Sequence, residues 1–189
     1  MDTPTIYLIA NNMSPSASLM EYLSNIEFRD DDMIVVFNKA DSPLINLLPR
    51  IDIACFRYGG GVKSKYHGIG SNLKIGSTQA RARRFFFLND PENIFVEPIV
   101  RENNIDEYEV HKDIKELSYR DIEYKCKRQN APTTGVFYLF HFLNAYPNHK
   151  IEMVGFDLFG DRKDNLHSFS KERDIVNKMK EYGNITLMI

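Results

Sequence analysis

Short apolar runs alternate with longer and more polar stretches along most of the chain. Continuous apolar runs that are rich in β-branched and aromatic residues are typical of strands buried on both faces of a sheet. The runs that meet this description predict strands at residues 5–10, 33–37, 51–56, 85–88, 94–96, 151–154 and 185–188.

Helical patterns fill several of the intervals between these runs. Apolar positions between residues 19 and 26 recur at helical spacing, and Ser14 followed by Pro15 predicts the N-cap and first residue of that helix. Residues 135–146 are apolar nearly all round, which predicts a central helix capped by the threonine pair 133–134. We also predict helices over 170–182 and over most of the charge-dense segment 105–127, with residues 114, 117 and 122 facing inward.

This order of elements favours an α/β fold. Buried strands that each lead towards a helix predict a single Rossmann-like domain over residues 1–189, with a mainly parallel sheet covered by helices on both faces. In such folds, ligands bind beyond the carboxyl ends of the strands. The residues that follow each strand are therefore the first candidates for function.

The charge balance, the length of the apolar runs and the cysteine spacing limit the partners and locations that we expect. The 189 residues carry 24 basic and 26 acidic side chains, a net charge of −2, so we expect no nucleic acid partner. No apolar run is long enough to cross a bilayer, and Cys55 and Cys126 lack metal-binding spacing, which indicates reduced thiols. We expect a cytoplasmic location, in solution or peripheral at the inner face of a membrane, with a homo-oligomer left open.

Asparagines follow two of the predicted strands. Asn11 and Asn12 come after the first strand, and Asn38 follows the second. A side-chain amide both donates and accepts hydrogen bonds, which suits ribose hydroxyls and base edges, and a following helix start offers N–H groups to a phosphate. Turn chemistry alone is the alternative interpretation. Neither a G-x-G-x-x-G nor a Walker motif occurs, so an ordinary NAD or ATP loop is not expected.

The segment 57–84 is the main charge anomaly. Its 28 residues contain seven Lys or Arg, no acid and six of the ten glycines. A basic segment after a strand could close over an anionic ligand, and a solvated surface loop is the alternative. Aromatic residues are limited to Tyr58 and Tyr66, which weakens an interpretation as a nucleic-acid site.

Acid clusters and one histidine complete the candidates. Residues 30–32 are three aspartates that precede a strand, so we expect a solvated turn at the end of the sheet away from the binding edge. Asp157, Asp161 and Asp164 follow a strand and could hold a hard cation as an alternative to metal-free chemistry. His167, at the start of a predicted helix, could act as a general base, or it could be structural or exposed.

Several of these pieces together resemble the motifs of sialyltransferases. Residues 132–137 (PTTGVF), the apolar helix and residues 151–157 (IEMVGFD) resemble the family's small motif, and His167 with Glu172 resembles its later histidine–glutamate motif. Residues 9–12 (IANN) and 36–38 (VFN) resemble the asparagine-bearing pieces of its large motif. The resemblance covers about the first 40 and last 60 residues in the family's order, and residues 41–130 carry none.

The resemblance implies an inverting, metal-independent glycosyltransferase without a resident cofactor. It would move sialic acid, or a related acidic sugar such as Kdo, from a CMP donor to a hydroxyl of a glycan acceptor. His167 would take the proton of the acceptor hydroxyl. The donor would lie against Asn11, Asn12, Asn38, Thr133, Thr134, Gly135, Gly155, Phe156 and Asp157.

The sequence departs from the family at two places. The first turn reads Asn11-Asn12-Met13 where the family has Gly-Asn-Gly or Gly-Asn-Ser. Tyrosines that bind the leaving phosphate in the bacterial branch have no counterpart here, because the nearby aromatics are Phe156, Phe159 and Phe169. The basic residues that could replace them at the phosphate or the acceptor are Lys63, Lys65, Arg162 and Lys171.

Two other functions stay open. One is a non-catalytic module that binds an anionic partner through the basic, Gly-rich segment 57–84. The other is a domain that binds a CMP-sugar without turnover, in keeping with the missing tyrosines.

Overall fold

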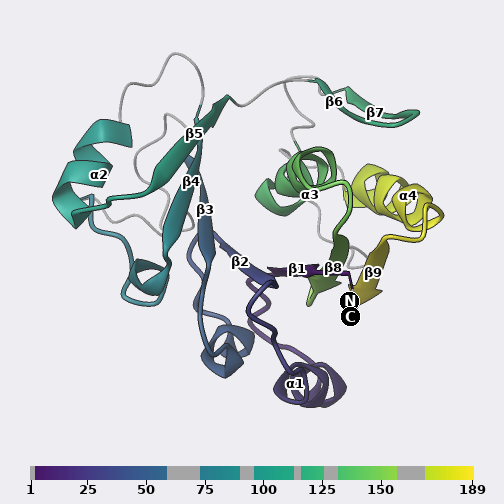
Figure 1. Ribbon diagram of the computed structural model, residues 1–189, viewed down its shortest axis with the longest axis horizontal. Coiled ribbons are helices and arrows are strands. Elements are labelled where there is room, and N and C mark those ends of the chain that lie inside the picture. The colour runs from purple at the N-terminus through teal and green to yellow at the C-terminus, as the bar shows by residue number, and fades with distance from the viewer. Residues whose placement is uncertain (1–2, 59–72, 90–95, 113–115, 126–131, 157–168) are drawn as a thin grey trace.

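The protein contains a parallel sheet (Figure 1). The computed structural model describes residues 3–58, 73–89, 96–112, 116–125, 132–156 and 169–189. Seven parallel strands pair in the order β5-β4-β3-β2-β1-β8-β9. The strands are β1 (Thr5–Ile9), β2 (Met33–Phe37), β3 (Ile53–Tyr58), β4 (Arg84–Asn89), β5 (Tyr108–Lys112), β8 (Lys150–Val154) and β9 (Ile185–Met188). The predicted α/β fold with a mainly parallel sheet is confirmed.

Helices cover both faces of this sheet (Figure 1). One face packs against α1 (Ala17–Ser24), the 3-10 helix η1 (Pro43–Leu47) and α2 (Val96–Asn103). The other face packs against α3 (Thr134–Ala145) and α4 (Phe169–Lys180), beside a hairpin of β6 (Glu116–Tyr119) and β7 (Ile122–Lys125). A second 3-10 helix, η2 (Gln79–Arg81), precedes β4.

The two-sided burial of the strands explains their continuous apolar sequence. In β4, Phe86 and Leu88 belong to the core cluster under α3 and α4, whereas Phe85 and Phe87 belong to the cluster under α1 and α2. Successive side chains of a strand point to opposite faces, so a strand covered on both faces needs apolar residues throughout.

The chain order reverses beside β1, and this positions the candidate site. From β1 the chain proceeds through β2, β3, β4 and β5 on one side, and β8 then pairs with the other side of β1. The loops that leave β1 and β8 therefore diverge. Crevices at such switch points are the usual ligand sites of open α/β sheets.

Three sequence predictions about elements are wrong. Ser16, not Ser14, caps α1, since its hydroxyl accepts the Leu19 N–H at 3.2 Å. Val96 begins helix α2 rather than ending a strand. The segment 105–127 holds β5, β6 and β7 among its described residues instead of a helix. Buried and exposed residues alternate along β6 and β7 with the two-residue period of a strand. The many charged residues of this segment hide that period in the sequence.

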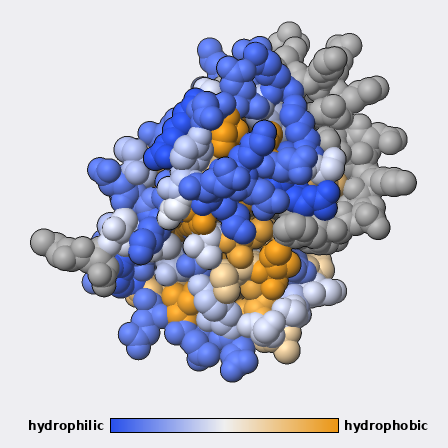
Figure 2. Space-filling model, turned by 90° about the vertical axis from the view of Figure 1, so that its right-hand side faces the viewer, coloured by the Kyte–Doolittle hydropathy of each residue, from blue (hydrophilic) through white to orange (hydrophobic). Residues whose placement is uncertain are grey.

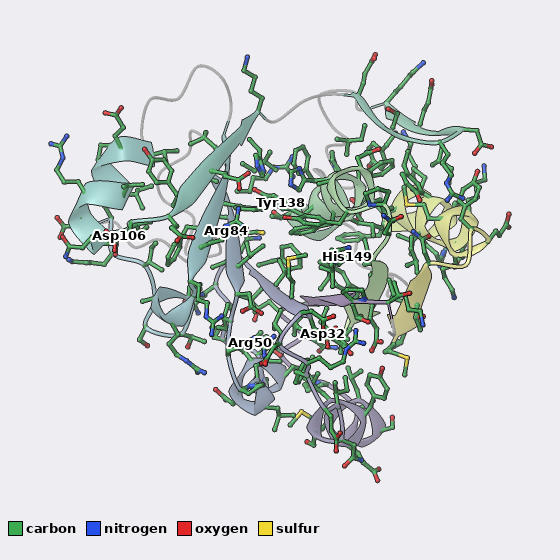
Figure 3. The ribbon with its side chains drawn as sticks, viewed as in Figure 1. Asp32, Arg50, Arg84, Asp106, Tyr138 and His149 are labelled. Carbon is green, nitrogen blue, oxygen red and sulfur yellow. The ribbon has the colours of Figure 1, made fainter. Side chains whose placement is uncertain are left out.

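The turn 30–32 lies before β2, as predicted, and Asp30 and Asp31 are exposed, but Asp32 is not solvated. The Asp32 side chain is 1% exposed, and its carboxylate accepts the Thr5 N–H at 2.8 Å and Arg29 Nη2 at 2.8 Å. Burial opposes ionisation, but these hydrogen bonds outweigh it and hold the pKa of Asp32 below its usual range. Arg50 donates to the Asp32 carbonyl at 2.9 Å, and both residues lie on the α1 side of the sheet (Figure 3).

The outer surface is mixed in character. The side formed by α4 and β9 is mostly hydrophilic, with a hydrophobic area in its lower half (Figure 2). None of the helices that the structure describes is long and apolar enough to cross a membrane.

Candidate functional site

The carboxyl ends of β1, β2, β3 and β8 meet the N-terminal turn of α3, and we call this region the carboxyl edge. Asn12 follows β1, and its side-chain oxygen accepts the Ser14 N–H at 2.9 Å. The hydroxyl of Ser42, 1% exposed, donates to the Asn12 carbonyl. Asn11 accepts the Asp41 N–H at 3.1 Å. The loop after β1 is thus fixed by the loop after β2.

Gly155 brings the end of β8 against this loop. Its φ of +76° lies in the left-handed region that favours glycine. A Cβ at this position would lie 2.7 Å from Leu44 Cδ1 and 3.5 Å from Asn12 Cβ. A side chain at Gly155 would therefore collide with Leu44 of η1, and the ends of β1 and β8 lie in ordinary van der Waals contact.

Asn38 stands at the centre of the carboxyl edge in a strained conformation. Its φ is +48°, and Ala40 two residues later has a φ of +29°. Its side-chain oxygen accepts the Arg57 N–H at 3.1 Å, its amide donates to Thr134 Oγ1 at 3.2 Å, and its carbonyl accepts from Gln79 Nε2 at 2.8 Å. These bonds hold a backbone conformation that costs free energy, as is common at functional sites.

The N-terminal turn of α3 presents backbone N–H groups at this edge. Thr133 is the N-cap, and its hydroxyl accepts the Val136 N–H at 3.3 Å. The amides of Thr134 and Gly135 meet no acceptor among the described residues. Free amides and the positive end of the helix dipole together attract anions.

Gly135 allows Phe156 to pack against this turn. A Cβ on Gly135 would collide with the Phe156 ring. Phe156 is 8% exposed and also makes an edge-to-face contact with Phe37 at 5.9 Å between ring centroids. Phe156 therefore braces the start of α3 against the end of β2.

Glu172 ties α4 to the same turn. Its side chain is fully buried, and its two carboxylate oxygens accept the Thr133 N–H at 2.6 Å and the Thr133 hydroxyl at 2.9 Å. The Thr133 hydroxyl donates its proton to Glu172, so its donor capacity is used inside the protein. Thr134 Oγ1 accepts from Asn38, which leaves the Thr134 hydroxyl proton able to serve a ligand.

Two ionisable groups near the carboxyl edge, Asp41 and Cys55, have shifted pKa values. The Lys39 ammonium, 2.6 Å from Asp41 Oδ2, holds the pKa of that carboxyl below its usual range. Cys55 lies under α3 in the core, and complete burial raises the pKa of its thiol well above the usual value. A thiol kept protonated in this way is a poor nucleophile.

The predicted site residues other than Lys171 fall into two groups. Asn11, Asn12, Asn38, Thr133, Thr134, Gly135, Gly155 and Phe156 all lie at the carboxyl edge. His167, Asp157, Lys63, Lys65 and Arg162 lie outside the described residues, as do Asp161 and Asp164 of the alternative cation site. Within the described part of the chain, no group of three or more His, Cys, Asp or Glu residues could hold a metal ion.

Lys171 has partners away from the turn of α3. Its Nζ donates to the Lys125 carbonyl at 2.8 Å and lies 4.3 Å from the centre of the Tyr124 ring. Both contacts are with β7. Its predicted part in phosphate or acceptor binding stays a prediction.

Sequence reasoning missed four residues that build the edge. They are Ser42, Arg57, Gln79 and, as a partner of Thr133, Glu172. Ser42 before Pro43 is a recognisable helix-cap signal, and its hydroxyl indeed caps η1. The bonds of the other three join residues that are far apart in the chain, and no local pattern signals them.

Comparisons with models of known protein families, with curated proteins and with solved structures found no match. The functional interpretation therefore depends on the geometry of the edge and on the motifs in the sequence.

Proposed function

We propose that this protein is an inverting, metal-independent glycosyltransferase that moves an acidic sugar from a CMP donor to a glycan hydroxyl. The sugar is sialic acid or a related one such as Kdo. The observation that carries the proposal is the pair of hydrogen bonds from Thr133 to Glu172, at 2.6 and 2.9 Å. These residues belong to two separate motifs that resemble those of sialyltransferases, 39 positions apart, and the fold joins them at the carboxyl edge.

The donor fits the edge as follows. The nucleotide lies where the loops after β1 and β8 diverge, beside Asn12 and Gly155. The phosphate meets the Thr134 and Gly135 amides at the start of α3. Asn38 fixes Thr134 by the 3.2 Å hydrogen bond, so its main role is to position that turn.

His167 supplies the base in this proposal. The acceptor oxygen attacks the anomeric carbon as the hydroxyl proton passes to the imidazole. The bond between that carbon and the phosphate oxygen breaks, and CMP leaves with the bonding electrons. His167 precedes Phe169, the first residue of α4, by two positions, and Glu172 in the first turn of α4 is bonded to the start of α3.

The proposed reaction requires the protein mainly to orient the substrates and to stabilise charge. CMP is a good leaving group, so the protein has to align two substrates, accept one proton and stabilise the departing phosphate. Fixed amides at a helix N-terminus stabilise that charge without reorganising during the reaction.

The test is CMP release from CMP-sialic acid with a panel of glycan acceptors, in the presence of EDTA. We expect turnover, and we expect His167→Ala to lower it by about 10²–10⁴-fold while CMP affinity stays nearly constant. His149→Ala is the matched control, because His149 precedes β8 at the other end of the sheet (Figure 3). Unchanged turnover in His167→Ala would contradict the assignment of His167 as the base. A strict need for Mn²⁺ or Mg²⁺ would favour the alternative cation site at Asp157, Asp161 and Asp164.

A CMP-sugar-binding domain without turnover is the second candidate. It is favoured by the Thr133 hydroxyl, whose proton is committed to Glu172, and by the phenylalanine at position 156. This candidate predicts CMP binding at the carboxyl edge with neither transfer nor hydrolysis of the donor.

The non-catalytic anion-binding module has less support. Segment 57–84 begins at the carboxyl edge, but its last two arginines lie by the start of β4, at the opposite end of the sheet. There, Arg83 lies 3.7 Å from Asp52, and Arg84 pairs with Glu109. Acids thus offset part of the charge that this function needs.

A further inference from the structure

The proposed function leaves the charge of the donor phosphate without an identified cation. The helix N-terminus supplies only partial charge. Phe156 and Phe169 carry no hydroxyl to replace the tyrosines expected by resemblance. A cation of the protein close to the start of α3 would complete the site.

Arg57 reaches that position from the end of β3. Its backbone N–H donates to Asn38, and its Nη1 donates to the carbonyl of Pro132, the residue before the N-cap of α3. Asn38 in turn donates to Thr134. The guanidinium therefore lies beside the start of α3, where the Pro132 carbonyl holds it, and the Arg57 backbone is joined to Asn38 at the end of the neighbouring strand β2.

Two described lysines near this edge, Lys39 and Lys171, have partners away from the start of α3. Lys39 pairs with Asp41 at 2.6 Å and has a 52% exposed side chain. Lys171 donates to the Lys125 carbonyl in β7. Neither contact directs the ammonium group to the start of α3.

We propose that Arg57 binds the phosphate of the donor at the start of α3 and stabilises its charge as CMP departs. This inference rests on the proposed function. A guanidinium has five N–H donors in a planar fork, so it can hold a carbonyl and a phosphate oxygen at the same time. Arg57 stays protonated throughout and transfers no proton.

The test compares the affinities of CMP and cytidine, which differ only in the phosphate. Calorimetry on the wild type and on Arg57→Gln separates a phosphate contact from a structural role, because loss of structure would weaken both ligands alike. We expect Arg57→Gln to weaken CMP by about 10–100-fold and cytidine by less than about threefold. Arg57→Lys, which keeps the charge without the fork, should give an intermediate loss of CMP affinity.

Arg84→Gln is the matched control, because Arg84 begins β4 at the opposite end of the sheet and pairs with Glu109 (Figure 3). It should leave both affinities unchanged. If Arg57→Gln does not fold, Arg57→Lys carries the comparison.

Three results overturn the proposal. Equal losses for CMP and cytidine in both Arg57 variants would show a structural role, and unchanged CMP affinity would show none. In either case the nucleotide site itself stands. If the wild type binds neither ligand up to millimolar concentration, the proposed function fails together with Arg57.

Discussion

The two ends of the sheet satisfy their polar groups in different ways. At the amino ends, Arg29, Asp32, Arg50 and Asp52 form what we call the amino-end cluster, in which charges pair and cap strand N–H groups, as in the 2.9 Å bond from Ile34 N to Asp52. At the carboxyl edge, hydrogen bonds hold Asn38 in a positive-φ conformation, and the Thr134 and Gly135 amides meet no acceptor among the described residues.

This difference separates stability from function. Every described charge of the amino-end cluster has an ion-pair partner within the protein, so the cluster contributes to folding. The carboxyl edge instead keeps strained backbone and helix amides that meet no acceptor among the described residues, which are costs that a ligand can offset. Substitutions at the two ends should therefore have different consequences.

The largest effect on folding should come from the amino-end cluster. Asp32→Ala leaves the Thr5 N–H and the Arg29 guanidinium without their buried acceptor, so we expect a loss of about 3 kcal/mol or more in the free energy of unfolding. Urea denaturation measures this loss, and CMP affinity of the folded fraction should not change. Asp31→Ala, at a 55% exposed residue, is the control and should cost less than about 0.5 kcal/mol. Equal effects of the two variants would contradict the comparison.

Glu172 should affect both folding and function. Glu172→Gln keeps one acceptor for Thr133 but replaces charge-assisted bonds, so we expect a loss of about 2 kcal/mol in unfolding free energy. CMP affinity should fall as well, because the start of α3 is no longer fixed. Denaturation and calorimetry on the same variant test this. A stability loss without any change in CMP affinity would argue that α4 does not position the donor site.

A smaller effect is expected where α3 meets Phe156. Gly135→Ala places a Cβ against the Phe156 ring, which should cost about 1–2 kcal/mol and weaken CMP by about tenfold. Combining it with Phe156→Leu should recover part of both losses, because the smaller side chain relieves the overlap. Gly183→Ala cannot serve as a control, because the φ of +78° at this position would strain an alanine although no neighbouring atom lies within 4 Å. Additive losses in the double variant would rule out the contact as the cause.

The smallest effect is a pH dependence far from both ends. Burial, and then the neighbouring charge of His111, lower the pKa of His141 in α3 to about 4 from an ordinary 6.5. The unfolded chain therefore takes up a proton on this residue before the folded protein does. Stability is complete above pH 6.5 and declines as the pH falls towards 4. Denaturation across this range should show a shallower decline in His141→Phe than in the wild type, and identical slopes would refute the assignment.

Much of the fold could be predicted because burial leaves a local pattern. Apolar runs identified β1, β2, β3, β4, β8 and β9, and the threonine cap with its apolar helix identified α3. The segment after residue 104 was misjudged because most of its side chains are exposed and charged, so its alternation rested on few apolar positions such as Leu117 and Tyr119.

The candidate site was predictable only as a location. Asn12, Asn38 and Gly155 follow strands, and parallel strands must end at one edge. What the side chains do there depends on contacts between distant segments. Arg57 bonds to a carbonyl 75 positions away, and Glu172 to a threonine 39 positions away. For the same reason, the sequence alone does not predict that the Thr133 hydroxyl donates its hydrogen bond to Glu172 rather than to a ligand.

The central claim, that the carboxyl edge binds a CMP donor, is tested most directly by a crystal structure after soaking with CMP. The account predicts the phosphate at the Thr134 and Gly135 amides, within reach of Arg57, and the nucleoside between the loops after β1 and β8. A CMP molecule bound elsewhere, or an edge left unoccupied at millimolar CMP, would contradict it.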